Sequence, residues 1–189
     1  MTYTDFTAKW PHEEIPDVYE GLAQICKLNG NDDVAILTLS KLDLDTDGLE
    51  ESGVTYEPTH QNETSLDPAG NWLDSNTLPY IVVPLCWPSD HPTSSLGCLC
   101  TVLYGGAHCH AVVGDFGPSH KFGEGSLALH RTLGFERIVD GKVQDCGIDS
   151  GVTILFHTAH KVSDGSVTAE LINQLAEPLF EAWANGSNG

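Results

Sequence analysis

Asp115 and Glu124 are the two acidic residues whose setting in the sequence best suits catalysis. They lie nine positions apart, and each stands beside glycine, in Gly114-Asp115 and in Gly123-Glu124-Gly125. Glycine permits positive φ and close backbone approach, so both acids are expected on tight turns. Hydrolysis of a glycosidic bond needs two such carboxylates, one to protonate the leaving oxygen and one to activate water or attack the sugar. The alternative is a pair of ordinary turn acids.

A second acidic segment, Asp43-Leu44-Asp45-Thr46-Asp47-Gly48, places carboxylates at alternate positions. It is similar to the first half of a calcium loop, with oxygens at positions one, three and five and a turning Gly at six. Position twelve, which needs an acid, is Val54. Three interpretations remain: a cation-binding loop, a subsite for the ammonium groups of an amino sugar, or a solvated acidic turn.

The run His108-Cys109-His110 suggests a metal cluster, because both histidines would share one face of a strand. No second ligand pair at zinc spacing accompanies it. We therefore predict strand residues beside the cleft, with no metal and no cofactor. The six cysteines permit three disulfides, but spacing does not give their pairing: they are Cys26, Cys86, Cys98, Cys100, Cys109 and Cys146.

Three groups of residues, in order along the chain, carry a resemblance to a known family. The runs at 113–118, 123–129 and 133–134 closely resemble the active-site segment of the fungal-type chitosanases, glycoside hydrolase family 75. The segment at 42–48 looks like the acidic D-x-D-x-D-G-type segment of that family. Leu73-Asp74 and the run at 78–84 look like its L-D…P-Y-(V/I)-V-(I/V)-P strand. The resemblance covers roughly residues 35–160.

The resemblance implies an endo-acting, inverting hydrolase of the β-1,4 bonds of chitosan, with Asp115 and Glu124 as its essential acids. It favours Glu124 as general acid and Asp115 as general base, while the barrel resemblance described below favours the opposite. It also favours the subsite interpretation of the acidic segment. Sugar faces stack on aromatic rings, and the predicted substrate-binding residues are Asp43, Asp45, Asp47, Trp72, Tyr80, Trp87, Phe116 and Lys121.

The charge of the chain agrees with a cationic substrate. Its 27 acidic and 8 basic residues give a net charge of −19. Such a field repels nucleic acid and anionic membranes and attracts polycations, although solubility or life in high salt would explain it equally. We expect a chitosan or chito-oligosaccharide partner, no nucleic acid, no membrane and a monomer.

The predicted elements are mostly β. Helices are expected at 13–28 and 168–183, and strands at 34–39, 80–85, 99–104, 111–113 and 152–157, with a Gly105-Gly106 turn. The core segment also resembles double-psi β-barrels, such as lytic transglycosylases and family 45 endoglucanases, but lacks the Asp of their Ile-Asp-Leu motif. We predict one catalytic domain over residues 1–189, built as a six- to eight-stranded double-psi-like barrel with flanking N- and C-terminal helices.

Location and substrate class carry alternatives. The N-terminus lacks the basic and apolar regions of a signal peptide, and we expect a secreted protein whose signal is absent from this sequence. No apolar run approaches the ~20 residues of a membrane span. The alternatives to a chitosanase are a hydrolase of another polysaccharide, chitin or β-glucan, and a non-catalytic module that binds cationic glycans.

Overall fold

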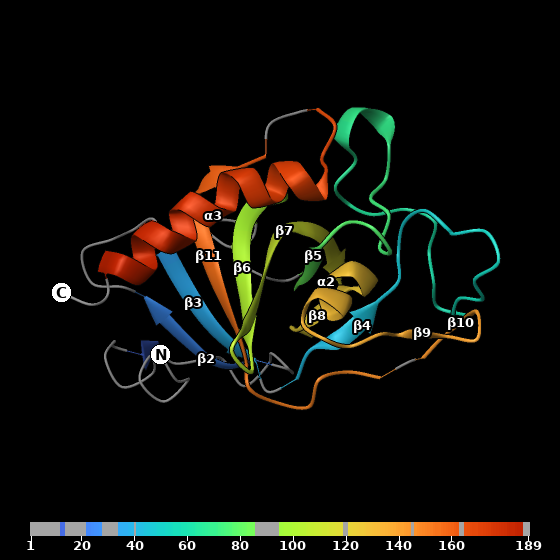
Figure 1. Ribbon diagram of the computed structural model, residues 1–189, viewed down its shortest axis with the longest axis horizontal. Helices are drawn as coiled ribbons and strands as arrows, with labels where there is room; N and C mark the ends of the chain where they lie inside the picture. Colours follow the sequence, from blue (N-terminus) through green and yellow to red (C-terminus); the bar gives the residue numbers. More distant parts are fainter. Residues whose placement is uncertain are drawn as a thin grey trace.

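The computed structural model describes residues 12–13, 22–27, 34–39, 41–85, 95–118, 121–144, 146–162 and 165–186. Its largest feature is one mixed sheet of nine strands in the order β1-β2-β3-β11-β6-β7-β5-β8-β4, drawn in Figure 1. The strands of this sheet are β1 (His12–Glu13), β2 (Leu22–Lys27), β3 (Val34–Leu39), β4 (Asp43–Asp45), β5 (Tyr80–Pro84), β6 (Cys98–Tyr104), β7 (Ala107–Gly117), β8 (Glu124–Ser126) and β11 (Val152–Lys161). The other elements are the 3-10 turn η1 (Pro68–Gly70), helices α2 (Leu127–Thr132) and α3 (Ala169–Gly186), and the ribbon of β9 (Ile138–Val139) and β10 (Lys142–Val143).

The sheet is open, so the predicted closed barrel is not found in the described part of the chain. Its edge strands, β1 and β4, do not pair with each other in the described residues. Two pairs, β5–β7 and β4–β8, are parallel, and the remaining neighbours are antiparallel. The six strands from β11 to β4, together with α2 and α3, therefore form a mixed α/β arrangement. The helices cover apolar surface of the open sheet that would face the interior of a barrel.

The predicted N-terminal helix at 13–28 is wrong where the structure describes it. Residues 22–27 form β2, which pairs antiparallel with β3 in the register Lys27↔Ala35 and Cys26↔Ile36, and residues 12–13 form β1. Residues 14–21 and 28 lie outside the described residues. A short apolar run fits helical and extended spacing alike, and here the ladder offered by β3 decided between them.

The other predicted strands are confirmed, and two are longer than expected. β7 runs to Gly117 and β11 to Lys161. β4 lies inside the segment predicted to be an acidic loop, because Asp43, Leu44 and Asp45 pair with β8. The apolar segment after Glu124 is the short helix α2, whose N-terminus is capped by Ser126.

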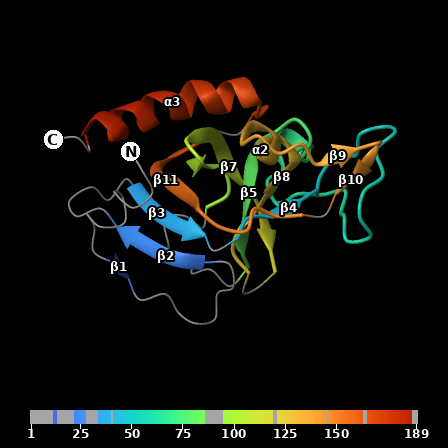
Figure 2. The ribbon, with the colours of Figure 1, turned by 60° about the horizontal axis from the view of Figure 1, so that its bottom comes forward.

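The C-terminal helix is confirmed as α3. It begins after Thr168, whose Oγ1 accepts a hydrogen bond from the Leu171 N–H at 3.1 Å, as expected of an N-cap. Figures 1 and 2 show α3 lying along one face of the sheet. Its buried Ile172 and Ala176 pack in a cluster with Leu73, Tyr80, Val82, Leu99 and Val112. A second core cluster includes Ile81, Val113 and Phe156. In the described part of the chain, no helix has the length and apolar character needed to span a membrane.

Candidate active site

A β-bulge in β7 aims Asp115. β5 and β7 pair in the register Ile81↔Val113 and then Val82↔Asp115, so Gly114 is an extra residue on β7. A bulge reverses the face on which later side chains lie, and this one brings Asp115 to the face of Val82. Position 114 tolerates only glycine, because a Cβ there would come within 2.6 Å of the Tyr80 Cβ.

Glu124 reaches the same face from the other side. β8 pairs with β5 in the register Val82↔Glu124, so Val82 stands between Asp115 on β7 and Glu124 on β8. Side chains in register on neighbouring strands share a face, and two strand spacings amount to ~9.6 Å between backbones. The sheet thus brings the two predicted catalytic acids together on one face. The resemblance to an inverting family predicts a gap of ~6.5–9.5 Å between the two carboxyl groups, which would leave room for a water, and this gap stays a prediction.

Asp115 is buried and held by three donors. Its Oδ1 accepts hydrogen bonds from the Ser65 N–H at 2.9 Å, from the Ser65 hydroxyl at 2.5 Å and from the Phe116 N–H at 2.7 Å. Within the described residues Oδ2 has no hydrogen bond. The arrangement fixes the carboxylate while one oxygen remains for a water or a sugar hydroxyl.

Glu124 is paired with a lysine and fits against a glycine. Lys121 Nζ lies 2.7 Å from Glu124 Oε1 and 2.8 Å from Asp43 Oδ2, so it bridges the two carboxylates. A Cβ on Gly117 would come within 2.7 Å of Glu124 Oε2, so glycine there makes room for the carboxylate. Lys41 also pairs with Asp43, at 2.6 Å.

One pocket of about 460 Å³ unites the acids. Five acidic residues line it, and no lysine, arginine or histidine is among its described lining residues. The acidic residues are Asp45, Asp47, Glu57, Asp115 and Glu124. Asp115 and Glu124 therefore share one pocket with Asp45 and Asp47, two acids of the segment at 43–48.

Burial and the neighbouring carboxylates both act on the pKa of Asp45 in this pocket. Burial raises the pKa of Asp45 to about 8, and the negative charges of Asp47, Asp115 and Glu124 add to the rise, against a hydrogen bond from the Asp47 N–H. Burial also raises the pKa of Asp47, opposed by a hydrogen bond from the Gln61 N–H. Asp45 is thus largely protonated at neutral pH. This protonated acid lies in the same pocket as Asp115 and Glu124.

The predicted substrate-binding residues divide into two groups. Asp45, Asp47 and Phe116 line the pocket. Four described residues do not: Asp43 and Lys121 pair with each other as given above, Trp72 is exposed, and Tyr80 is buried with its hydroxyl donated to the Asp47 carbonyl at 2.8 Å. The prediction that Tyr80 stacks on sugar is wrong, because its ring belongs to the core beneath α3. Trp87 lies outside the described residues.

Ser65 and Glu57 were missed by the sequence analysis. Both lie in the polar stretch between residues 53 and 77, which reads as turns, and Ser65 is fifty residues from the carboxylate it holds. No spacing signal links such distant positions, although the Leu66 N–H···O=C Gly114 bond at 2.9 Å anchors this stretch beside the bulge. Gly117 belongs to the motif run at 113–118, but the sequence does not show that it makes room for Glu124.

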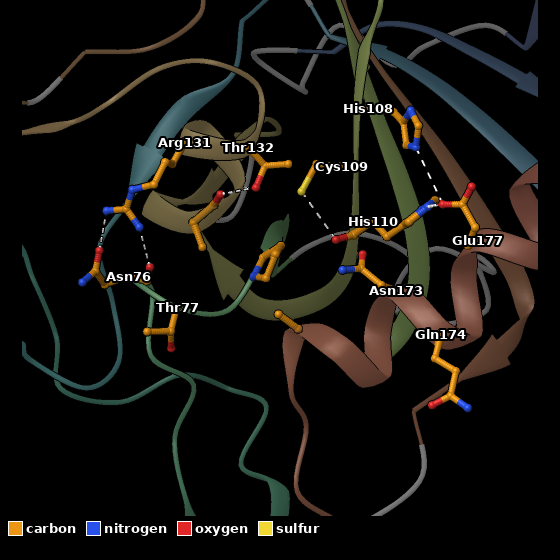
Figure 3. A pocket seen from close by; sticks show the side chains of 13 residues that line it. Asn76, Thr77, His108, Cys109, His110, Arg131, Thr132, Asn173, Gln174 and Glu177 are labelled. Atoms are coloured by element: carbon orange, nitrogen blue, oxygen red, sulfur yellow. Dashed lines mark hydrogen bonds and ion pairs between the residues drawn. The ribbon is translucent and has the colours of Figure 1, made fainter.

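His108 and His110 do not line the acidic pocket. They lie at the opposite end of β7 and line a second pocket, where they meet Glu177 of α3 (Figure 3). The expectation that they stand beside the catalytic cleft is wrong. The helix supplies a third potential ligand that the linear sequence does not reveal.

Comparisons with known proteins do not assign this chain to a family. No protein-family model matches this chain, and no curated protein was found to match it. The likeness to family 75 chitosanases therefore depends on the motif residues alone, and the activity enters below as a proposal.

Proposed function

We propose that this protein is an endo-acting, inverting glycoside hydrolase that cleaves the β-1,4 bonds of chitosan. One observation carries the proposal: five acidic residues line a single pocket that has no basic residue among its described lining. Two of them, Asp115 and Glu124, are the acids predicted from the sequence motif. The proposed identification with family 75, secretion and a monomeric state depend on the motif resemblance.

The charge of the pocket favours a cationic ligand. Asp45 is neutral at pH 7 chiefly because of burial, with neighbouring carboxylates adding repulsion. An ammonium group placed among them would relieve that repulsion and favour the ionised form of Asp45. A neutral glycan such as chitin or β-glucan would leave it unrelieved. Chitosan supplies one ammonium for each deacetylated sugar, so the charge of the pocket supports it over those alternatives.

The two acids suit a single-displacement reaction. Asp115, held through Oδ1 by three donors, keeps Oδ2 for positioning and deprotonating the attacking water. Glu124 then protonates the leaving glycosidic oxygen. Lys121, which bridges Glu124 and Asp43, retains Asp43 as a partner whenever Glu124 carries the proton. Phe116 supplies a ring at the pocket wall on which a sugar face can stack.

The test is release of reducing ends from soluble chitosan, colloidal chitin and carboxymethyl cellulose. We expect release from chitosan alone, together with inversion of anomeric configuration in the first product. Cleavage of chitin or cellulose but not chitosan would assign another polysaccharide. Retardation of chitosan without any release of sugar would overturn the hydrolase and leave a glycan-binding module.

A further inference from the structure

Three potential metal ligands meet where α3 crosses the beginning of β7. His108 and His110 are two positions apart on β7, so both side chains lie on the face that α3 covers. Glu177 Oε2 lies 2.6 Å from His110 Nε2 and 3.8 Å from His108 Nε2. The ligand atoms of all three residues lie within 4.8 Å of one another. Figure 3 shows the two imidazoles and the carboxylate turned toward one another.

We propose that His108, His110 and Glu177 bind a divalent transition-metal ion, with Zn²⁺ as the best fit. Imidazole nitrogen and carboxylate oxygen are ordinary zinc ligands, and two histidines with one glutamate form a known catalytic set that leaves a fourth position open. Tetrahedral bonds of ~2.0–2.1 Å separate neighbouring ligand atoms by ~3.4 Å. The two distances from Glu177 bracket that value, so small side-chain adjustments suffice. The site is independent of the chitosanase proposal.

A buried chain of hydrogen bonds orients His110 for this role. Its Nδ1 lies 2.9 Å from Thr101 Oγ1, which in turn lies 3.2 Å from His157 Nε2. Metal-binding histidines usually donate their second ring N–H to an oxygen acceptor, most often a carboxylate, a backbone carbonyl or water, and here the Thr101 hydroxyl oxygen stands in that place. With a metal on Nε2, His110 Nδ1–H donates to Thr101, and the Thr101 hydroxyl donates to His157. Burial lowers the pKa of His157 to about 4, so its ring is neutral and can accept.

The surroundings leave one side of the triad open. His108 and Glu177 are about half exposed, whereas His110 is buried. The ring of Phe180 lies 4.9 Å from that of His108, which restrains the exposed imidazole. Beyond the triad is a pocket of about 850 Å³, where Asn173, Gln174 and Thr132 add polar groups. A metal here would therefore keep a coordination position for water or a small ligand.

The cysteine between the two histidines is not part of the set. Cys109 is buried, and its Sγ lies 3.5 Å from the His110 carbonyl oxygen, to which it donates. Successive residues of a strand lie on opposite faces, so its side chain lies on the face away from His108 and His110 and packs in the core cluster that includes Val113. The ligand set is thus two imidazoles and one carboxylate.

The experiment is titration of the full chain, purified without a histidine tag and stripped of metal, with Zn²⁺ by calorimetry and with Co²⁺ by visible absorption. We expect one equivalent to bind, with cobalt bands of a low-coordinate site. His108→Asn and Glu177→Gln change exposed side chains and should each weaken binding at least ~10-fold, and Thr101→Val should weaken it ~10–100-fold through orientation of His110. The exposed His160→Asn is the matched control and should bind like the wild type.

Failure of the wild-type protein to bind one equivalent of Zn²⁺ or Co²⁺ would reduce the triad to an ion pair and overturn the proposal. Binding that is lost in Asp45→Asn but kept in His108→Asn would place the metal in the acidic pocket and overturn it equally. Circular dichroism of each variant separates loss of ligand from loss of fold. Hydrolysis of chitosan by the metal-free protein is a separate measurement, so the two proposals can fail independently.

Discussion

Strand β7 carries different chemistry at its two ends. Its last residues present Asp115 to a pocket of carboxylates, and its first residues present His108 and His110 to Glu177. The acidic end takes Asp115 and Glu124 from one glycine-rich motif, while the segments 44–61 and 82–85 supply most of its other lining. The histidine end needs a helix that begins about sixty residues later. Functional residues that are close in the sequence can be identified from a motif. Residues that a distant helix brings together can be identified only from the folded structure.

The largest expected effect concerns the acidic end alone. Asp115→Asn and Glu124→Gln should each lower kcat on chitosan by ~10²–10⁴-fold, because each removes a group that transfers a proton in the proposed reaction. Asp67→Asn, which removes an exposed charge outside the pocket, is the control and should keep the wild-type rate. A near-wild-type rate in either pocket variant would show that the chemistry lies elsewhere.

The buried histidines should limit stability in acid. Burial lowers the pKa of His157, behind the histidine end, and of His130, beside β4, to about 4 from an ordinary value near 6.5. Between those values the unfolded chain binds more protons, so the free energy of unfolding should fall as pH drops from about 6.5 to 4. Each histidine accounts for up to ~3 kcal/mol.

Urea unfolding of the wild type and of His130→Gln and His157→Gln between pH 7 and 4 measures this effect. Each variant should lose part of the pH dependence even where its stability at pH 7 is lower. An unchanged slope in both variants would assign acid sensitivity to other groups.

At the acidic end, the contribution of Asp45 to folding stability should depend on pH in the opposite direction. The pKa of Asp45 rises from 3.8 to about 8 on folding, so the folded state binds the extra proton and its contribution to stability is lost as pH rises through about 8. Asp45→Asn keeps an oxygen to accept the Asp47 N–H and cannot ionise. We expect its Tm to exceed that of the wild type at pH 9 by about 2–4 °C, the equivalent of ~1 kcal/mol, and to match it more closely at pH 5. A parallel pair of Tm curves would contradict the shift.

Salt should have a small effect on the KM for chitosan, and it should act only through the acidic end. The Debye length falls from ~10 Å at 0.1 M to ~3 Å at 1 M salt, which screens the attraction between the pocket and a polycation. We expect the KM for chitosan to rise by about a few-fold over this range, and Asp47→Asn, which keeps the acceptor for the Gln61 N–H at 2.7 Å, to reduce the rise. A flat profile in both proteins would make the acidity a trait of solubility.

Much of the fold followed from local pattern. Strands β3, β5, β6 and the first part of β11 were predicted from apolar and β-branched runs, and α3 from its helical spacing and Thr168 cap. The helix predicted at 13–28 failed because extended pairing with β3 is a long-range contact that local spacing does not contain. Closure of a sheet is likewise a relation between its two edges, so no single strand predicted that this one stays open.

For the candidate site, the motif residues indicated that Asp115 and Glu124 belong together and that glycine is needed beside them. A side chain at position 114 would collide with Tyr80, and one at position 117 would collide with Glu124. Such close approaches require glycine, which is visible in the sequence. The other properties of the site arise from the folded chain. Folding buried Tyr80, brought Ser65 to Asp115 and raised the pKa of Asp45 by desolvation among carboxylates. It also placed Glu177 against two histidines of β7. These properties depend on distances across the fold and on removal from water, which neighbours along the chain do not set.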